Sequence, residues 1–565
     1  SLFVSLSFIP TMASRFFHRD VSGARIHGVT EKLLSRMEKG YGDLVLWSLN
    51  NRKKVIILAF LLLVMTFTGF RFIGTELAPD PDTGDVEISF TLPEGTRIEV
   101  TDALVREVIS YCNENIPEAL TIYGYDGMEE EGFSIAAGQE AGTNIGTVGM
   151  KLVEKQQRER SAFEIAQLVR NWLRKKPGIE KMTVQVTSPI KSLFMGAKPL
   201  NVEVYGDDLE EVITVAERIR GLLSEIPGAV DLSLSQKQSR PELWTYIDKQ
   251  KAALMGVSTL SIANTLRTFF YGFETSESFW ESEDDYPIRV KLKEDQKNDL
   301  EIFERIKIPS SRGDLLSLSA FARIHDVLGP PQIDRKNKQR YVMVQGNVHG
   351  SSLGQVTQEA KKVIENMEIP SGVRIEFGGE IKEQGDAFRQ MGYLVLLGIL
   401  LVYMVMAGQY EAYLDPFVIM FSIPFALTGV VIAYLITGIY LSLQGILGVI
   451  MLIGIVVNNA IVLVDYINLL RARGQKIREA LVNAGERRLR PILMTTLTTF
   501  FGMLPMAVSR GQGAEMWRPL AVSVMGGLLV SMAVTLVLIP VVYSIVEERI
   551  RKIPRFVEAM EVSEG

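Results

Sequence analysis

The chain has few residues suited to covalent or metal chemistry. Its 565 residues include one cysteine, Cys112, and four histidines. A single cysteine excludes an internal disulfide framework, and the histidines are scattered along the sequence. The sequence also lacks the motifs GxSxG and HExxH, a Cys/His cluster and a phosphate-binding glycine loop. These absences leave no catalytic centre, so we expect a protein that is not an enzyme and that needs no cofactor.

The chain also lacks a large excess of charge of one sign. The formal net charge is -6, which does not suggest nucleic-acid binding. Hydrophobic residues make up 47% of the chain and charged residues 22%. This composition is too apolar for an ordinary soluble protein and too charged for a membrane bundle alone. We therefore expect a membrane part and a large water-exposed part.

Long apolar stretches locate the membrane part, since a span needs roughly 17 to 25 such residues. The candidate spans cover about 55–73, 388–408, 416–437, 441–468, 491–509 and 519–546. The shorter apolar stretch 1–14 predicts the end of a truncated transmembrane helix. The fold class expected for this part is an α-helical membrane bundle of six full spans plus the tail of another.

Basic residues predict the orientation of these spans. Arg52–Lys54 precede the first span, a basic loop at 471–490 joins two later spans, and the stretch EERIRKIPR (547–555), which begins the tail 547–565, follows the last. The positive-inside rule places all three in the cytoplasm, so residues 75–385 would be extracytoplasmic. Segment 15–54 predicts an amphipathic linker helix on the cytoplasmic face, although an ordinary solvated linker also fits.

The water-exposed part repeats a strand-helix-strand pattern four times, with proline or glycine after each helix. Two units lie within 75–190, a third within 198–236 and a fourth within 340–380. Such units build split β-α-β domains, so we expect an α+β region of ferredoxin-like repeats. The insert at 241–335 has its own strand and helix signals and predicts a separate mixed α/β subdomain.

Four sequence stretches together resemble a known family. They are TELAPDPDTGDVEISFTLPEGT (75–96), GIVVNNAIVLVDYIN (454–468), RLRPILMTTLTTFFGMLP (488–505) and GQGAEMWRPLAVSVMGG (511–527). With the layout of helices and repeats, they resemble the C-terminal half of a resistance-nodulation-division (RND) efflux transporter of the AcrB-like multidrug branch. The resemblance implies that the repeats are porter-like subdomains, that the insert is a docking-like subdomain, and that 388–546 supplies five transmembrane helices.

The resemblance implies export of amphiphilic compounds such as drugs, detergents or lipids, driven by the proton-motive force. In this branch, a lysine on the tenth helix works with paired carboxylates on the fourth and with a threonine and an arginine on the eleventh. Here Asn458 stands at the lysine position and Asn459 follows it, while Thr495 and Arg488 occupy the other two positions. Because an amide carries no charge, coupling would depend on carboxylates outside this chain.

Structural roles for the same four residues remain open. Amides and hydroxyls at membrane depth also join helices as packing contacts. Thr495 could bond its own backbone, and Arg488 could be a snorkelling anchor at the cytoplasmic boundary.

Substrate contacts are expected near the loop 124–144, which joins the first two repeats. The resemblance places a binding cleft there, lined by Tyr123, Tyr125, Met128, Phe133 and Thr147. Aromatic and methionine side chains give adaptable apolar contact to varied ligands. Tyr123 and Thr147 could equally be ordinary strand residues.

Two other functions stay open. The 22 methionines suggest heavy-metal cation efflux within the same superfamily, since thioether sulfur suits soft Cu(I). A non-transport membrane-tethered protein is the third alternative. For a transporter, the resemblance implies a bacterial inner (cytoplasmic) membrane, the N-terminal half of the same transporter and a homotrimer. It also implies a periplasmic adaptor and an outer-membrane channel if the host is Gram-negative.

Overall fold

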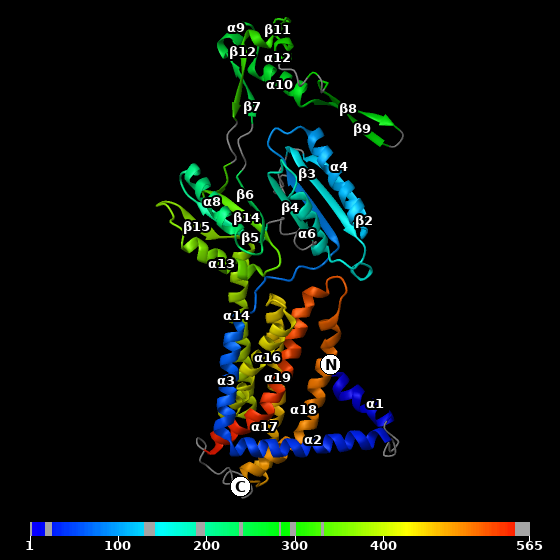
Figure 1. Cartoon of the computed structure of the whole chain (residues 1–565), viewed down its shortest axis with the longest axis vertical. Coiled ribbons are helices and arrows are strands. Elements are labelled where there is room, and N and C mark those ends of the chain that lie inside the picture. The colour runs from blue at the N-terminus through cyan, green and yellow to red at the C-terminus, as the bar shows by residue number, and fades with distance from the viewer. Residues whose placement is uncertain are drawn as a thin grey trace. The chain divides into compact units, whose positions relative to one another are not determined.

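Long helices and mixed α/β subdomains make up the protein (Figure 1). The computed structural model describes residues 3–16, 25–128, 142–187, 198–236, 241–281, 284–293, 296, 301–328 and 333–548. The chain divides into two compact units. One comprises Ser1–Ser235 with Asp334–Gly565, and the other comprises Gln236–Ile333. The first unit holds the long helices and two larger β-sheets.

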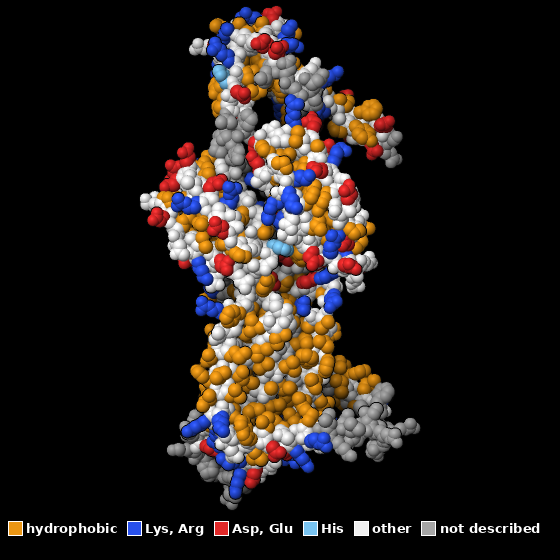
Figure 2. Space-filling view, viewed as in Figure 1, with side chains coloured by type: hydrophobic (Ala, Val, Ile, Leu, Met, Phe, Trp, Pro, Cys, Tyr) orange, Lys and Arg blue, Asp and Glu red, His pale blue; other side chains and the backbone are white. Residues whose placement is uncertain are grey.

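Within the described ranges, six helical segments are long and apolar enough to cross a membrane. They are α3 (Arg52–Phe70), α14 (Gly379–Tyr410), α15 and α16 (Leu414–Met420 and Ser422–Thr437, which form one segment), α17 (Leu443–Ala472), α18 (Ile477–Val508) and α19 (Ala514–Val546). Figure 2 shows a belt of apolar side chains around these helices, with charged side chains gathered beyond both of its edges. The prediction of six membrane-length helices is therefore confirmed.

Helix α19 packs against α16, α17 and α18, and small residues allow the close approach of α16 and α19. A Cβ added at Gly429 of α16 would lie 2.2 Å from the carbonyl oxygen of Gly526 on α19. One turn further along α16, the Tyr434 hydroxyl lies 3.0 Å from Ser523 Oγ and donates to the Pro519 carbonyl at 3.0 Å. These contacts fix the bundle around α19.

The basic segment 471–490 is mostly helical, so the prediction of a loop there is wrong. Helix α17 continues to Ala472, and α18 begins at Ile477 after a short turn. Ala480, Leu481 and Ala484 on this early part of α18 are fully buried. Their burial stabilises helix where the charged residues alone suggest a solvated loop.

Helix α2 (Arg25–Asn50) lies within the segment 15–54 and packs against this early part of α18 and against α19. The cytoplasmic placement of this segment stays a prediction. The Tyr41 hydroxyl donates to the Leu536 carbonyl of α19 at 2.7 Å. The Tyr41 ring lies against Gly485 of α18, where an added Cβ would meet it at 2.7 Å. At the start of the chain, residues Val4–Phe8 and α1 (Ile9–Phe16) are helical.

The first sheet follows α3 and has antiparallel strand order β2-β3-β1-β4. Its elements are β1 (Asp85–Thr91), α4 (Ile98–Asn115), β2 (Ala119–Met128), β3 (Gly142–Leu152), α6 (Ala162–Leu173) and β4 (Lys181–Val186). Alternate residues of β1, such as Ile88 and Phe90, are buried with Val105 of α4 and Ile165 of α6 in one core. The other face of the sheet carries the polar residues of the alternation.

The second sheet repeats this topology, with β6-β14-β5-β15 in antiparallel order and β13 paired to β14. Its elements are β5 (Leu200–Tyr205), α8 (Leu209–Ser224), β6 (Ala229–Leu234), β13 (Arg335–Lys336), β14 (Gln339–Val348), α13 (Leu353–Glu365) and β15 (Arg374–Phe377). The second compact unit, Gln236–Ile333, falls between β6 and β13 and overlaps the insert predicted at 241–335.

The described residues of that unit form three two-stranded antiparallel sheets, β7 with β12, β8 with β9 and β10 with β11, together with short helices. Ile262, Ile308 and Phe321 are buried in the unit's own core. Its elements are β7 (Pro241–Ile247), α9 (Lys249–Leu254), α10 (Thr259–Phe270), β8 (Phe273–Glu281), β9 (Asp284–Val290), α12 (Ile302–Arg305), β10 (Lys307–Pro309), β11 (Leu315–Ser317) and β12 (Ala322–Leu328).

A buried ion pair joins the two sheets of the first unit. Arg170 of α6 donates to Asp231 of β6 from Nε at 2.9 Å and from Nη2 at 3.0 Å. Asp231 also accepts from Asn347 Nδ2 at 3.1 Å and from the Val184 amide at 3.4 Å. The charged side chains are only 4% and 0% exposed. A buried, desolvated ion pair thus connects the subdomain of the first sheet to the subdomain of the second.

Candidate functional site

A polar contact crosses between α17 and α18 inside the apolar belt. Asn459 of α17 donates from Nδ2 to Thr496 Oγ1 of α18 at 3.3 Å, and Thr495 Oγ1 donates to Asn459 Oδ1 at 3.3 Å. Thr496 is 1% exposed. Thr495 Oγ1 also lies 3.0 Å from the Ile492 carbonyl of its own helix. The structure therefore brings Asn459 and Thr495 together, and adds Thr496.

Asn458 and Arg488 lie outside this contact. The Asn458 side chain is exposed on α17, and no hydrogen bond joins it to another described residue. Arg488 lies seven residues before Thr495, about 10.5 Å along an α-helix. Its guanidinium stacks over the Tyr466 ring with Cζ 4.6 Å from the ring centroid, while its buried Nε has no partner among the described residues.

A second polar cluster, which we did not predict, lies near the end of the bundle that α2 crosses. Asp415, at the start of α15, is 2% exposed and accepts from Asn468 Nδ2 at 3.2 Å. The Tyr543 hydroxyl donates to Asn468 Oδ1 at 2.6 Å. Nearby, Arg471 of α17 pairs at 2.8 Å with Glu547, the residue that follows α19. Asp415 could have been found from the sequence, because it is a carboxylate in the LDPF stretch at the start of an apolar span.

Three of the predicted substrate residues, Tyr123, Tyr125 and Thr147, share the face of the first sheet opposite α4 and α6. Tyr123 and Tyr125 of β2 are two residues apart, and Tyr125 lies directly opposite Thr147 of β3. Tyr123 is 58% exposed, Tyr125 is 43% exposed and Thr147 is 6% exposed. The Tyr123 ring covers Gly149, where an added Cβ would lie 2.1 Å from it.

The two remaining substrate predictions are not tested by side-chain geometry. Met128 ends β2 in register with Gly142, but its side chain is outside the described set. Phe133 lies outside the described residues altogether.

Glu87 is a further group on this face. It stands on β1 between Gly149 and Gln185 in the sheet register. Burial raises the pKa of Glu87, and a hydrogen bond to Gln185 partly opposes that rise. The alternation in DVEISFT places Glu87 and Ser89 opposite the buried Val86 and Ile88, so period-two analysis could have found it. The face thus combines two aromatic rings with one desolvated carboxyl group.

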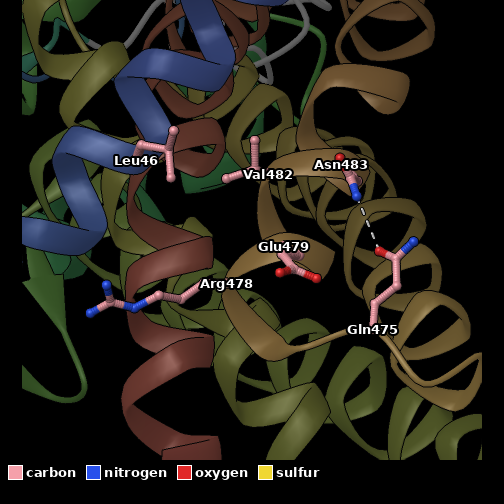
Figure 3. Close-up of a pocket in the computed structure, with 6 residues that line it drawn as sticks. All are labelled: Leu46, Gln475, Arg478, Glu479, Val482 and Asn483. Carbon is pink, nitrogen blue, oxygen red and sulfur yellow. Dashed lines mark hydrogen bonds between the residues drawn. The ribbon is translucent and has the colours of Figure 1, made fainter.

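A pocket of about 330 Å³ lies between α2 and the start of α18, apart from these residues. Figure 3 shows Leu46 of α2 on one side and Glu479, Val482 and Asn483 of α18 on the other. Asn483 donates to Gln475 Oε1 at 3.2 Å across its edge. Among the described residues, no group of three or more His, Cys, Asp or Glu side chains could hold a metal ion.

The apolar helices of membrane-spanning length and the large α/β region are the architecture of a membrane protein. A family model described as AcrB/AcrD/AcrF matches residues 1–547. The chain therefore belongs to the AcrB/AcrD/AcrF family of RND efflux transporters, which confirms the resemblance found in the sequence. The members of this family are transporters and not enzymes.

Curated relatives include both metal and drug pumps. The chain is 28% identical over 562 residues to the cobalt-zinc-cadmium resistance protein CzcA of Cupriavidus metallidurans, covering 97% of this chain and 52% of the relative. It is 26% identical over 551 residues to the multidrug resistance protein MdtC of Yersinia enterocolitica, covering 96% and 52%. The chain thus spans about half the length of the curated relatives it matches.

The fold also matches a solved structure. The crystal structure of a heavy metal efflux pump superimposes with a TM-score of 0.79 at 24% identity, covering 92% of this chain and 52% of that one. At this identity the match establishes the fold and does not identify the substrate class.

Proposed function

We propose that this chain forms half of a proton-driven efflux pump for amphiphilic compounds in a bacterial inner membrane. The single observation that carries the proposal is the Asn459, Thr495 and Thr496 contact between α17 and α18. Polar side chains are costly in an apolar belt unless they are paired or functional. This cluster can exchange hydrogen-bond partners when a neighbouring carboxylate gains or loses a proton.

The titrating carboxylates would come from the other half of the transporter. Asn458 is exposed on α17, and we propose that it faces that half. Because Asn458 replaces a lysine, the site would contribute hydrogen-bond rearrangement and no charge. In this proposal α2 lies on the cytoplasmic side and the sheets lie in the periplasm. Trimer formation, a periplasmic adaptor and an outer-membrane channel belong to the same proposal.

The amphiphilic substrate class is supported by the face of Tyr123, Tyr125 and Thr147. Two partly exposed rings offer apolar contact area, and the adjoining Glu87 carboxyl would favour compounds with a cationic group. Phe133 and Met128 remain proposed substrate contacts from the sequence. Adaptable apolar contacts of this kind suit ligands of varied shape.

Export of heavy-metal cations is the second candidate, favoured by the similarity to CzcA. The two functions are separable by direct measurement. Cells without their own pumps should carry the complete transporter, and efflux of a cationic amphiphilic dye and of zinc, cobalt and cadmium should be recorded with and without an uncoupler. We expect uncoupler-sensitive dye efflux. Metal export without a dye response would replace the first proposal with the second.

The role of the polar contact needs a matched pair of variants on α18. Thr496→Val removes the hydroxyl that accepts from Asn459, whereas Thr499→Val removes one that bonds its own helix, with Oγ1 3.0 Å from the Thr495 carbonyl. A contact between membrane helices is worth about 0.6–2 kcal/mol, so both variants should assemble. We expect efflux to fall in Thr496→Val, Asn459→Ala and Asn458→Ala, and to persist in Thr499→Val. Unchanged efflux in the first three would reduce these groups to packing contacts.

A further inference from the structure

A pocket of about 260 Å³ lies where α13 and the start of α14 meet the segment that follows α3. Thr75, Thr357, Lys361, Gln384 and Phe388 are among its lining residues. Thr75 is fixed there because its carbonyl accepts from the Gly354 amide of α13 at 3.0 Å. The pocket therefore joins the second sheet's subdomain to the transmembrane helix α14, away from the face of Tyr123.

Two polar atoms in this pocket are buried without partners. Thr357 Oγ1 and Gln384 Nε2 have no hydrogen-bond partner among the described residues, and each of these residues is only 7% exposed. A buried donor without an acceptor destabilises the fold, so such groups are rare and need an explanation. Both atoms can donate. A ligand with acceptor oxygens would satisfy them together.

The charge of the pocket favours an anion. Its lining includes Lys361 and no aspartate or glutamate. The Lys361 ammonium lies 5.4 Å from the centroid of the Phe377 ring, which holds it near the pocket.

The pocket also lies at the level of a lipid headgroup. On α14 the residues from Gln390 to Tyr410 carry no charge. Phe388 and Gln384 precede Gln390 by two and six residues, which is about 3 Å and 9 Å along the helix. The headgroup layer on each side of a bilayer is roughly 5–7 Å thick. The pocket thus extends from within this layer to just above it.

The volume of the pocket and the apolar residues beside it limit the kind of ligand that it can hold. Pockets for drug-sized ligands measure roughly 300–1,000 Å³, so this one suits a headgroup better than a whole drug. Below it, Tyr393 and Leu396 of α14 are each 66% exposed. They offer an apolar surface along which an acyl chain can lie.

We propose that this pocket binds the phosphate group of a membrane lipid in the leaflet next to the sheets. Lys361, Gln384 and Thr357 donate to the phosphate oxygens, and the acyl chains follow α14. The proposal depends on the membrane placement of α14 and not on which compound the transporter exports. Lipid binding and efflux can therefore fail independently.

The test uses the purified complete transporter, delipidated in detergent and titrated with dioleoyl phosphatidylglycerol in native mass spectrometry. We expect saturable binding that weakens about tenfold, equivalent to about 1.4 kcal/mol, in Lys361→Gln and in Gln384→Leu. Lys362→Gln removes the same charge from the next residue of α13, which does not line the pocket. It should bind as the parent does.

Two further measurements make the outcome decisive. Thr357→Val should raise thermal stability in lipid-free detergent, because it removes an unpaired hydroxyl, and should weaken lipid binding. Dioleoylglycerol, which has the same chains without phosphate, should not bind. Equal binding of both lipids, or equal effects of Lys361→Gln and Lys362→Gln, would overturn the proposal. If inorganic phosphate at the same concentration as the lipid displaced the lipid fully, the pocket would be a site for free anions. That result would also overturn the proposal.

Discussion

Breaking the ion pair between Arg170 and Asp231 should loosen the contact between the two sheets. Replacing Arg170 with Met leaves a carboxylate that is 0% exposed with only the Asn347 amide and the Val184 amide as donors. Removing one partner of a buried pair typically costs about 3–5 kcal/mol. Asp231 has a φ of 54°, a conformation that asparagine tolerates better than most residues. Asp231→Asn therefore removes the charge without adding backbone strain.

Hydrogen exchange at the Val184 amide measures this loosening, because that amide donates to Asp231. A loss of about 3–5 kcal/mol in local opening free energy accelerates exchange roughly a hundred- to several-thousandfold. We expect that range for Arg170→Met. The double variant Arg170→Met/Asp231→Asn has no buried charge and should recover most of the protection.

The amide of Val215, buried on α8 and away from the pair, is the internal control and should keep its exchange rate. If Val184 exchanges at the parent rate in Arg170→Met, the pair does not hold the sheets together. A double variant as labile as the worse single variant would show that the cost comes from lost packing and not from an unpaired charge.

Three further predictions follow from packing and from pKa values. Gly429→Ala should lower thermal stability by about 1–3 kcal/mol, since its Cβ would meet the Gly526 carbonyl. Gly454→Ala on α17, with no atom within 4 Å of the added carbon, is the control and should not. Burial raises the pKa of the Cys112 thiol to about 12, so a maleimide should label the unfolded and not the native protein at pH 8. Burial lowers the pKa of His349, and the positive charge of Arg170 lowers it further. Its proton therefore binds the unfolded state more tightly, and stability should fall as pH drops below about 6.5. His349→Gln should flatten that dependence, and an unchanged profile would contradict it.

Elements with a clear period or length could be predicted from the sequence. Strict alternation in DVEISFT gives β1, and the apolar runs give the membrane-length helices. The helical part of 477–490 could not be predicted as readily, because its charged residues resemble a loop. Its stability comes from burial of Ala480 and Leu481 against other helices, which is a tertiary effect.

The sequence predicts which part of α17 carries the candidate site, but not which side chains make the contact. The sequence singles out Asn458 and Asn459, but helix rotation decides which amide meets α18, and the structure selects Asn459. Thr496 was missed because one residue along a helix changes the face by about 100°. The proposed lipid pocket is lined by residues that are far apart in the sequence, among them Thr75, Thr357 and Gln384. A local sequence pattern cannot predict that such residues come together.

Proton-driven export is tested most directly by transport measurements on the complete transporter, reconstituted in liposomes with an imposed pH gradient. We expect a cationic amphiphilic dye to move against its own gradient only while the proton gradient lasts, and we expect Asn459→Ala to slow this movement. Dye movement that ignores the proton gradient, or gradient-driven transport of zinc with none of the dye, would contradict it.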